Sequence, residues 1–401
     1  METHLDNIKI KSLPYLRLFL IIFLLINLVG IINFPFYRET LKNDVLFFLV
    51  FLGFMGFTIG TLLIRTLKFK TPSIKGRFKP KLFRMIFIGV NLLSFLLIVM
   101  THVMNRGILI IMGDKRYVTY AYTTLFIYCG LIITLLFVAQ TLLDNKRLSK
   151  RLIFFVVLQS ISVLSMGYRS PLIILVGGTL LIFIMIENDY QNKFKKVFTI
   201  RNILLFLGVL ILMSSISSYR VSQKYDVRRF FRSMDFDFID DHPYIMPIMP
   251  TLAVFRYDQD IVIKLIKKTR YKPLMGELAM SNFLTLLPGE QLGVRNIIGG
   301  IVDSRKFPDG RPWSITPTLQ GALFVDGGFF GVFFGFFILA ACIEYFKKIM
   351  VKRKDPFSTV LYAMFAINSL MLIHTGYFDV IFFLLIAVMV ALRIVVMRIK
   401  F

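Results

Sequence analysis

The sequence predicts an all-α polytopic membrane protein with about ten transmembrane helices and one large extracytoplasmic loop that carries amphipathic helices. Hydrophobic residues make up 57% of the 401-residue chain, and its mean hydropathy is +0.73. A soluble protein of this size keeps far more polar surface. The formal net charge is +25, but the basic residues lie in short clusters between apolar runs, as in the cytoplasmic loops of membrane proteins. This distribution argues against nucleic acid as a partner.

Apolar runs define the predicted spans, because a helix needs about 20 residues to cross about 30 Å of hydrocarbon. Three of the runs, the fifth, sixth and ninth along the chain, are short for this purpose. The ten runs cover residues 13–33, 44–64, 84–104, 120–142, 152–168, 171–187, 202–219, 328–346, 359–375 and 378–397.

The orientation of these spans follows from the Lys and Arg content of alternate short loops. Loop 65–84 holds eight basic residues, 344–356 holds five, and 144–151 and 187–201 hold four each. The short loops on the other side hold between none and three. Basic residues are enriched in cytoplasmic loops, so we expect both termini to be cytoplasmic and the protein to lie in the cell membrane.

The spans divide the chain into three parts. Residues 1–219 form an N-terminal bundle of about seven spans, and residues 328–401 contribute about three more. Between them, residues 220–327 form the large loop, which this topology places outside. Up to Trp313 the loop carries 15 basic and 11 acidic residues, and long loops translocate largely regardless of charge. Loops of this length are commonly functional.

Two segments of the large loop have helical periodicity. Residues 258–272 place apolar side chains on one face and lysines mainly on another, and residues 277–288 form a second candidate helix. Two interpretations fit this pattern: helices that lie on the membrane surface, or a small folded outer domain that buries the same faces. The apolar face of the first segment consists of Ile261, Val262, Leu265 and Ile266.

The exit from the loop is an apolar stretch of 27 residues, 316–342, which is about 40 Å as a helix. This exceeds the length needed to cross the membrane. We therefore expect a half-helix at 316–325, a break at the Gly327-Gly328 pair and a spanning helix at 328–346. Irregular backbone at this depth is tolerated where it lines a polar cavity.

Asp326 immediately precedes that break. Ionisable residues near the membrane are candidates for function, so Asp326 is a candidate catalytic residue at the outer mouth of a cavity. The alternative interpretation is that Asp326 caps the helix that begins at the glycines.

Arginines gather on the predicted outer side. Each guanidinium offers five donors in a fixed fork, which suits the oxygens of a pyrophosphate. The alternative is that each arginine only anchors at lipid headgroups, although Arg169 lies in a tight turn, "GYRSP", that has hardly any loop around it. The arginines in question are Arg169, Arg220, Arg256, Arg295, Arg305 and Arg311.

No motif of a soluble enzyme accompanies these residues. The chain lacks a Walker loop, H-E-x-x-H, G-x-S-x-G and CxxC, so we expect no cofactor and no metal. Cys129 and Cys342 both lie in apolar runs, which argues against a disulfide framework. His374 and Asp379 share the outer turn "HTGYFD", where either is a candidate base or simply part of a polar turn.

This layout resembles that of the O-antigen, or oligosaccharide repeat-unit, polymerases. Three places carry the resemblance: the short-loop sequence Gly167-Tyr168-Arg169-Ser170, a helix that ends at Arg220 before a large outer loop, and the exit stretch "RPWSITPTLQGALFVDGGFFG". The arginine-to-glycine spacing of sixteen that is highlighted in some members also occurs, at Arg305–Gly321 and Arg311–Gly327. The chain departs from the related ligases, because neither His242 nor His374 has a glycine eight positions later.

The resemblance implies a glycosyltransferase that polymerises oligosaccharide repeat units on a polyprenyl pyrophosphate. The acceptor hydroxyl would attack the anomeric carbon and the lipid pyrophosphate would leave. The implied catalytic residues are Asp326 as base and Arg169, Arg220 and Arg311 as pyrophosphate clamps. The implied substrate-binding residues are Arg305, Trp313, which would stack on a sugar, Thr316, Thr318, Arg256, Arg295 and His374.

Other partners implied are membrane lipid, a chain-length regulator and a flippase.

Two alternative functions share some features of this sequence. A flippase for lipid-linked oligosaccharides would also have many spans and charged residues near cavities, although no inverted repeat of spans is visible. A ligase-like glycan transferase would use the same chemistry with a different acceptor.

Overall fold

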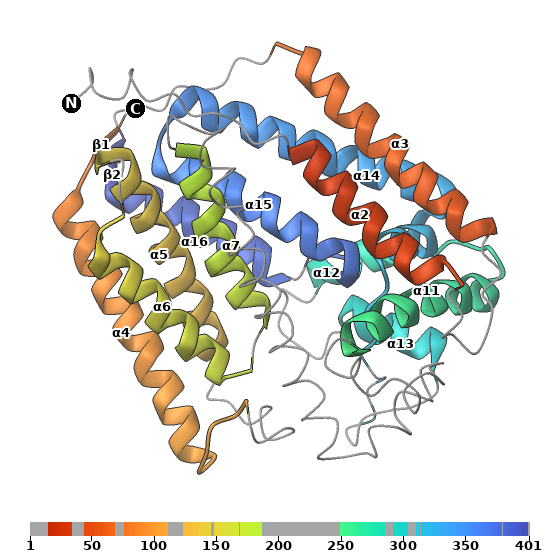
Figure 1. Ribbon diagram of the computed structural model, residues 1–401, viewed down its shortest axis with the longest axis horizontal. Coiled ribbons are helices and arrows are strands. Elements are labelled where there is room, and N and C mark those ends of the chain that lie inside the picture. Colours follow the sequence, from red (N-terminus) through yellow and green to blue (C-terminus); the bar gives the residue numbers. More distant parts are fainter. Residues whose placement is uncertain are drawn as a thin grey trace.

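The computed structural model is a bundle of helices with three further helices gathered at one end (Figure 1). The structure describes residues 15–33, 44–68, 76–110, 123–145, 148–167, 169–186, 249–284, 292–303, 310, 312, 314–378 and 380–399.

A helix lies at nine of the ten predicted spans, and the other, 202–219, lies outside the described residues. Five of the described helices (α3, α4, α5, α14 and α15) are long and apolar enough to cross a membrane, while three further apolar helices are shorter. The prediction of a helical, multi-pass membrane protein is confirmed, and the count of ten spans stays a prediction. The nine helices are α2 (Tyr15–Ile31), α3 (Asp44–Thr66), α4 (Pro80–Met104), α5 (Thr123–Asn145), α6 (Lys150–Ser165), α7 (Arg169–Ile186), α14 (Leu319–Arg353), α15 (Pro356–Thr375) and α16 (Val380–Val396).

Helices α3 and α14 lie side by side with their backbones in close contact (Figure 1). A Cβ atom added at Gly56 would lie 2.3 Å from the Phe333 carbonyl oxygen, and one at Gly60 would lie 2.4 Å from that of Phe337. Small residues permit such approach between membrane helices, where van der Waals packing replaces the hydrophobic effect as the driving force. The glycines of α3 therefore position α14, which carries part of the site.

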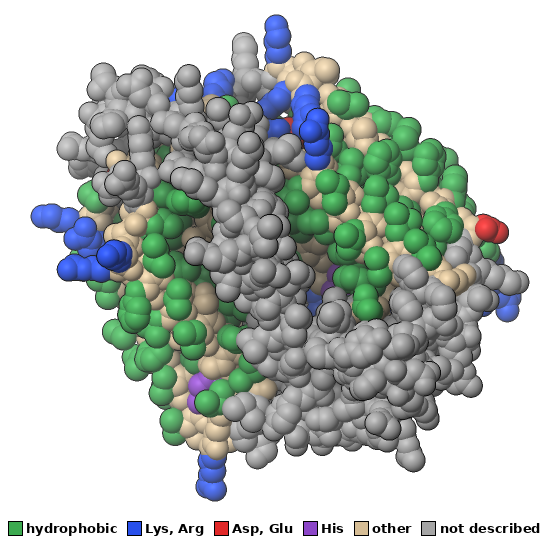
Figure 2. Space-filling view, in the orientation of Figure 1, with side chains coloured by type: hydrophobic (Ala, Val, Ile, Leu, Met, Phe, Trp, Pro, Cys, Tyr) green, Lys and Arg blue, Asp and Glu red, His purple; other side chains and the backbone are tan. Residues whose placement is uncertain are grey.

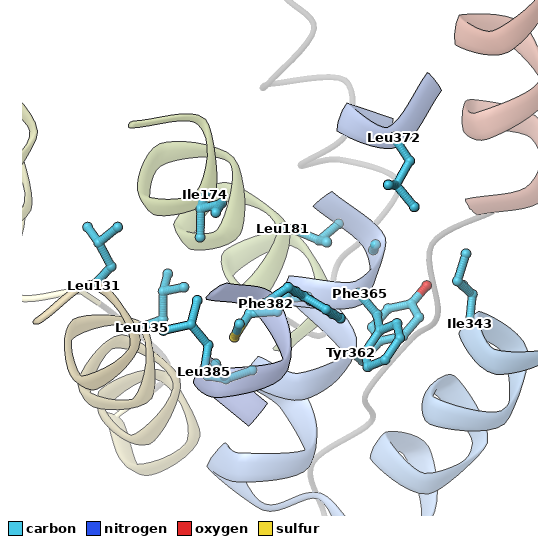
Figure 3. Packing of buried hydrophobic residues seen from close by; sticks show 14 of the residues in the cluster. Leu131, Leu135, Ile174, Leu181, Ile343, Tyr362, Phe365, Leu372, Phe382 and Leu385 are labelled. Carbon is cyan, nitrogen blue, oxygen red and sulfur yellow. The ribbon is translucent and has the colours of Figure 1, made fainter. Parts of the chain in front are cut away.

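The centre of the bundle is a hydrophobic core shared by α5, α7, α15 and α16. Figure 3 shows Leu135 of α5, Leu181 of α7 and Phe382 of α16 around this core. Tyr362 and Phe365 of α15 reach the same region, and Tyr362 is fully buried. Because α15 is buried on most of its surface, its C-terminal end is held firmly where it enters the site.

The outer flanks of the bundle are apolar. Figure 2 shows hydrophobic side chains over the described flanks, while Lys and Arg side chains gather toward the extremities. Met85 of α4 and Phe154 of α6 are 71% and 69% exposed, respectively. A broad apolar surface of this kind would be a liability in water and is the normal surface of a protein in lipid.

One end of the bundle carries charged and polar contacts between loops predicted to be cytoplasmic. Buried Glu344 forms ion pairs with Arg65 at 2.8 Å and Lys347 at 3.0 Å. The Lys348 ammonium donates to the carbonyls of Ile64, Arg65 and Leu67 and so caps the C-terminus of α3.

At the same end, β1 (Gly76–Phe78) pairs in antiparallel fashion with β2 (Met397–Ile399). This two-stranded ribbon is the departure from the predicted all-α fold among the described residues. It ties the segment before α4 to the segment after α16.

At the opposite end lie α11 (Met249–Thr269), α12 (Glu277–Leu284) and α13 (Val294–Val302) (Figure 1). The predicted apolar face of α11 is buried in protein, where it packs with α13 and α14. For α11 this favours the folded-domain interpretation over a helix lying on the membrane surface. In α12, by contrast, Met280 and Phe283 are 60% and 50% exposed.

The predicted break at the glycine pair is present in α14. Gly328 has φ 63° and ψ −153°, which separates a first segment, 319–327, from a second segment, 329–353. The helix begins at Leu319 and not at 316, because the Thr318 hydroxyl accepts a hydrogen bond from the Gly321 N–H and forms the N-cap. Whether the first segment dips into the membrane stays a prediction.

Candidate functional site

The residues that can carry chemistry meet where α11, α12 and α13 pack against the first segment of α14 and the turn between α15 and α16. This is the end of the bundle opposite the β1–β2 ribbon (Figure 1). Two pockets open here, separated by Tyr377.

The central polar contact is between α11 and the end of α15. The Asp258 Oδ2 atom lies 2.5 Å from the His374 Nδ1 atom. The Asp258 side chain is 1% exposed, while that of His374 is 38% exposed. Burial raises the pKa of the Asp258 carboxyl to about 6, and the hydrogen bond and charge of His374 oppose that rise. In the part of the chain that the structure describes, no group bonds to the second ring nitrogen of His374, so this atom can accept a proton from a ligand.

Asp258 is held in place by the packing of α11 against α2. A Cβ atom at Gly30 would lie 2.4 Å from the Phe255 carbonyl oxygen, so only glycine permits this approach. Next to Asp258, the Gln259 amide donates to the Asn27 Oδ1 atom at 2.9 Å, and the Gln320 amide donates to the same oxygen. These three buried amides link α2, α11 and α14, and they make the position of Asp258 rigid.

Arg256, a predicted substrate-binding residue, lies in the same buried layer. Its guanidinium donates to the Gly30 carbonyl oxygen at 3.2 Å and to the Asn33 Oδ1 atom at 3.1 Å. The side chain is 1% exposed. These contacts complement the C-terminus of α2, where a positive charge is favourable. They describe a structural cap, and a role of Arg256 in substrate binding stays a prediction.

We call the first of the two pockets the arginine pocket. It is narrow, with a volume of about 30 Å³. Its lining includes Arg295 of α13, Ser170 of α7, Tyr128 of α5, and Thr375 and Tyr377 near the end of α15, and the remaining lining is mostly apolar, from α7, α15, α16 and the turn. Five helices and the α15–α16 turn therefore contribute to it. His374 immediately precedes Thr375, which brings the Asp258–His374 pair next to a lining that includes a guanidinium and a helix N-terminus.

We call the second the break pocket, because it lies beside the interruption of α14. Its volume is about 520 Å³, and Asp326, Gly327 and Gly331 form one wall. The Tyr377 ring also lines the pocket, and the rest of the lining comes from Pro273, Met275, Gly276, Leu323 and Phe330. Tyr377 lines both pockets.

Asp326 serves as a helix cap, but for a different helix from the one expected. Its Oδ1 atom accepts a hydrogen bond from the Leu278 N–H at 2.9 Å, and its Oδ2 atom accepts one from the Ala279 N–H at 3.1 Å. Both N–H groups belong to the first turn of α12, which otherwise has no intrahelical partner for them. The Tyr377 hydroxyl donates to Oδ2 at 2.8 Å, and burial, followed by the charge of Asp326, raises the pKa of Tyr377. Asp326 therefore positions α12, and its assignment as a base stays a prediction.

Thr316 and Thr318 lie directly before α14. Thr318 is fully buried and its hydroxyl forms the N-cap described above, while Thr316 is half-buried. Pro317 between them contacts Gly376, whose φ of 89° shapes the turn that follows His374. Both threonines thus border the α15–α16 turn.

Several predicted site residues lie outside the described residues. These are Arg220, Arg305, Arg311 and Trp313, and Asp379 of the "HTGYFD" turn is also among them. Arg169 begins α7, but only its backbone is described. All of these assignments stay predictions. Among the described residues, no group of three or more His, Cys, Asp or Glu could hold a metal ion.

Sequence reasoning missed two residues of the site, Asp258 and Tyr377. A signal for Asp258 was present, since it lies three and four residues before Ile261 and Val262 and therefore on the buried face of α11. An acidic residue on an otherwise apolar helical face needs a partner. No comparable pattern marks Tyr377, whose position depends on the turn after α15.

The comparisons with known proteins concern this same region. A family model described as "Putative O-antigen polymerase" matches residues 248–386. In comparisons with curated proteins and with solved structures, nothing matches the chain. The matched segment begins just before α11, ends within α16 and includes Asp258, His374, the break pocket and the part of the arginine pocket that α13, α15 and α16 form. The match covers about a third of the chain and supports an O-antigen polymerase assignment for that segment.

Proposed function

We propose that this protein polymerises polyprenyl-pyrophosphate-linked oligosaccharide repeat units into a surface polysaccharide, by glycosyl transfer on the outer face of the cytoplasmic membrane. The observation that carries the proposal is the hydrogen-bonded Asp258–His374 pair, in which His374 directly precedes Thr375 of the arginine pocket. The match to the polymerase family over residues 248–386 supports it. A chain-length regulator and a flippase are expected partners of such an activity.

The pair is suited to general base catalysis. The acceptor hydroxyl must lose a proton as its oxygen attacks the anomeric carbon, and the exposed nitrogen of His374 can take that proton. Asp258, buried behind the ring, orients the imidazole and stabilises the imidazolium that forms. In this assignment His374 is the base and Asp258 is a positioning residue, while Asp326 holds the wall of the neighbouring pocket.

The leaving group is a lipid pyrophosphate on which negative charge develops. Arg295 and the N-terminus of α7, where Arg169 begins the helix, lie around the arginine pocket. Helix N-termini and guanidinium groups both stabilise phosphate oxygens. We propose Arg169 and Arg295 as pyrophosphate clamps, together with Arg220, Arg305 and Arg311, with Trp313 stacking on a sugar ring.

Replacing Arg169 with alanine should lower the rate of chain extension about 100-fold, because one donor to the developing charge is lost. The measurement is the length of polymer that purified protein makes from lipid-linked repeat units, resolved on a gel. Arg151→Ala, an exposed arginine at the other end of the bundle, is the matched control and should leave the length unchanged. An Arg169→Ala protein that inserts normally yet keeps full polymer length would rule out the clamp assignment.

The function itself is tested by the surface polysaccharide of a strain that lacks this protein. If the ladder collapses to one capped repeat unit, the protein is a polymerase. Loss of all surface glycan, with lipid-linked units retained inside, would instead indicate a flippase. Long chains left on the lipid carrier would indicate a ligase.

A further inference from the structure

The break pocket has a different chemical character from the arginine pocket. No Lys or Arg is among the residues that line it in the described part of the chain. Its walls are mostly apolar, from Pro273, Met275, Leu323 and Phe330. The one carboxylate, Asp326, already accepts three hydrogen bonds from protein groups. A pocket of this kind, within the range of about 300–1,000 Å³ typical of ligand sites, suits an apolar ligand and not a charged one.

The pocket is continuous with exposed apolar surface. Phe330 and Met275, at its rim, are 78% and 85% exposed. The exposed side of α12, with Met280 and Phe283, lies next to them, and the Phe283 ring lies 5.3 Å from the Phe383 ring of α16. This surface joins the flank of α14, where Phe334 and other apolar side chains are also exposed. The rim of the pocket therefore presents apolar side chains to a lipid chain that approaches it.

Tyr377 places the pocket beside the site of chemistry. Its ring lines the break pocket and the arginine pocket, and its hydroxyl is fixed by Asp326 at 2.8 Å. A ligand that extends from one pocket to the other would meet apolar walls at one end and the Arg295 guanidinium at the other. A lipid with phosphate groups at its head matches this order of surfaces.

We propose that the break pocket binds the isoprenoid chain of the lipid-linked substrate next to its pyrophosphate, with Tyr377 at the boundary between chain and headgroup. The proposal rests on the proposed function, whose substrate it locates. Gly327 and Gly331 leave room for the chain in the wall of the pocket, and Asp326 keeps α12 at its entrance.

The chain offers a variant that fills the pocket without disturbing the fold. A Cβ atom added at Gly327 meets nothing within 4 Å, and the residue has an ordinary helical φ. Gly327→Leu therefore places an isobutyl group in the pocket. Gly89→Leu is the matched control, because Gly89 is exposed on α4 and its Cβ also meets nothing within 4 Å.

The probe is a polyprenyl phosphate that carries a photoreactive group near its phosphate, added to the full-length protein in lipid nanodiscs. We expect labelling of residues 273–276 and 323–331, competition by unlabelled geranylgeranyl diphosphate, and little competition by inorganic pyrophosphate or a diacyl phospholipid. Gly327→Leu should reduce the labelling about tenfold, the effect of about 1.4 kcal/mol of overpacking. Gly89→Leu should label like the unchanged protein.

Labelling that survives in Gly327→Leu, or that a diacyl phospholipid removes as well as geranylgeranyl diphosphate does, would overturn the proposal. The second result would mean that the pocket takes ordinary membrane lipid. Binding does not require glycosyl transfer, so the two proposals fail separately. A protein that labels as expected but extends no polymer would contradict the proposed function and leave the pocket assignment intact.

Discussion

Replacing His374 with alanine should lower kcat for glycosyl transfer about 1,000-fold, because general base catalysis contributes about 10²–10⁴ to such rates. KM for the lipid-linked acceptor should change little, since the proton transfer occurs in the transition state and the imidazole is not part of the proposed clamp. The measurement is initial rate against acceptor concentration with purified protein. His374→Asn should lose as much activity, because its amide can still donate to Asp258 but lacks the exposed ring nitrogen.

His102 provides a matched control for this prediction. Like His374 it lies in the last turn of a long helix, and its Nε2 atom is hydrogen-bonded to the Ser165 hydroxyl at 2.8 Å. His102→Ala should retain most of the activity. If His374→Asn kept full activity in a folded protein, the base would have to be another group, and Asp326 would be the next candidate.

The pH dependence should report the state of Asp258. Its folded pKa of about 6 is raised from an ordinary value of 3.8, so the carboxyl is protonated below pH 6 and charged above it. A neutral Asp258 stabilises an imidazolium poorly, so kcat should rise as the pH passes through about 6. Stability should change in the opposite direction. The folded state binds this proton more tightly than the unfolded state, so the stabilisation is complete below pH 3.8 and is lost as the pH rises through about 6.

This prediction is checked by rate and melting profiles between pH 4 and 8. In Asp258→Asn, which cannot ionise, the inflection of the melting profile near pH 6 should disappear and kcat should be low throughout. A melting inflection near pH 6 that persists in Asp258→Asn would assign it to a different group.

Replacing Gly328 with alanine should destabilise the protein by about 3 kcal/mol, because φ 63° with ψ −153° lies in a region that essentially only glycine adopts. No side chain lies within 4 Å of a Cβ atom there, so backbone strain alone causes the effect. The measurement is the melting temperature and the yield of monodisperse protein in detergent.

Gly327→Ala is the control for this substitution. It is the adjacent residue, has an ordinary helical φ, and a Cβ atom there also meets nothing within 4 Å. Its melting temperature should equal or slightly exceed that of the unchanged protein, since alanine favours helix over glycine by about 1 kcal/mol. Equal melting temperatures of Gly328→Ala and Gly327→Ala would show that α14 can straighten at the break, and that the interruption is not needed for the fold.

The spans and the break could be predicted because their causes are local. The length of an apolar run decides whether it can cross a membrane, and two adjacent glycines within such a run mark a place where the helix can be interrupted. The sequence also indicated the apolar face of α11, but not what covers it. Membrane surface and folded protein select the same side chains, so Ile261 and Val262 are compatible with both.

The site was less predictable because its contacts are long-range. Asp258 and His374 are 116 residues apart, and nothing near either of them indicates the other. The hydrogen bonds of Asp326 to α12 likewise depend on how residues 273–276 fold back on α14. Each residue type suggested a candidate role, but the partner that decides between base and cap comes from tertiary packing.

The separation between Asp258 and His374 in the sequence also means that the two residues are synthesised at different times. At about 5–20 residues per second, the ribosome adds His374 roughly ten seconds after Asp258, when α11 to α14 have already been synthesised. The hydrogen bond from the Tyr377 hydroxyl to Asp326 cannot form before that time either. If His374 is the proposed base, a nascent chain cannot become active before its last helical hairpin is in place, and a chain truncated before that hairpin would insert without the base.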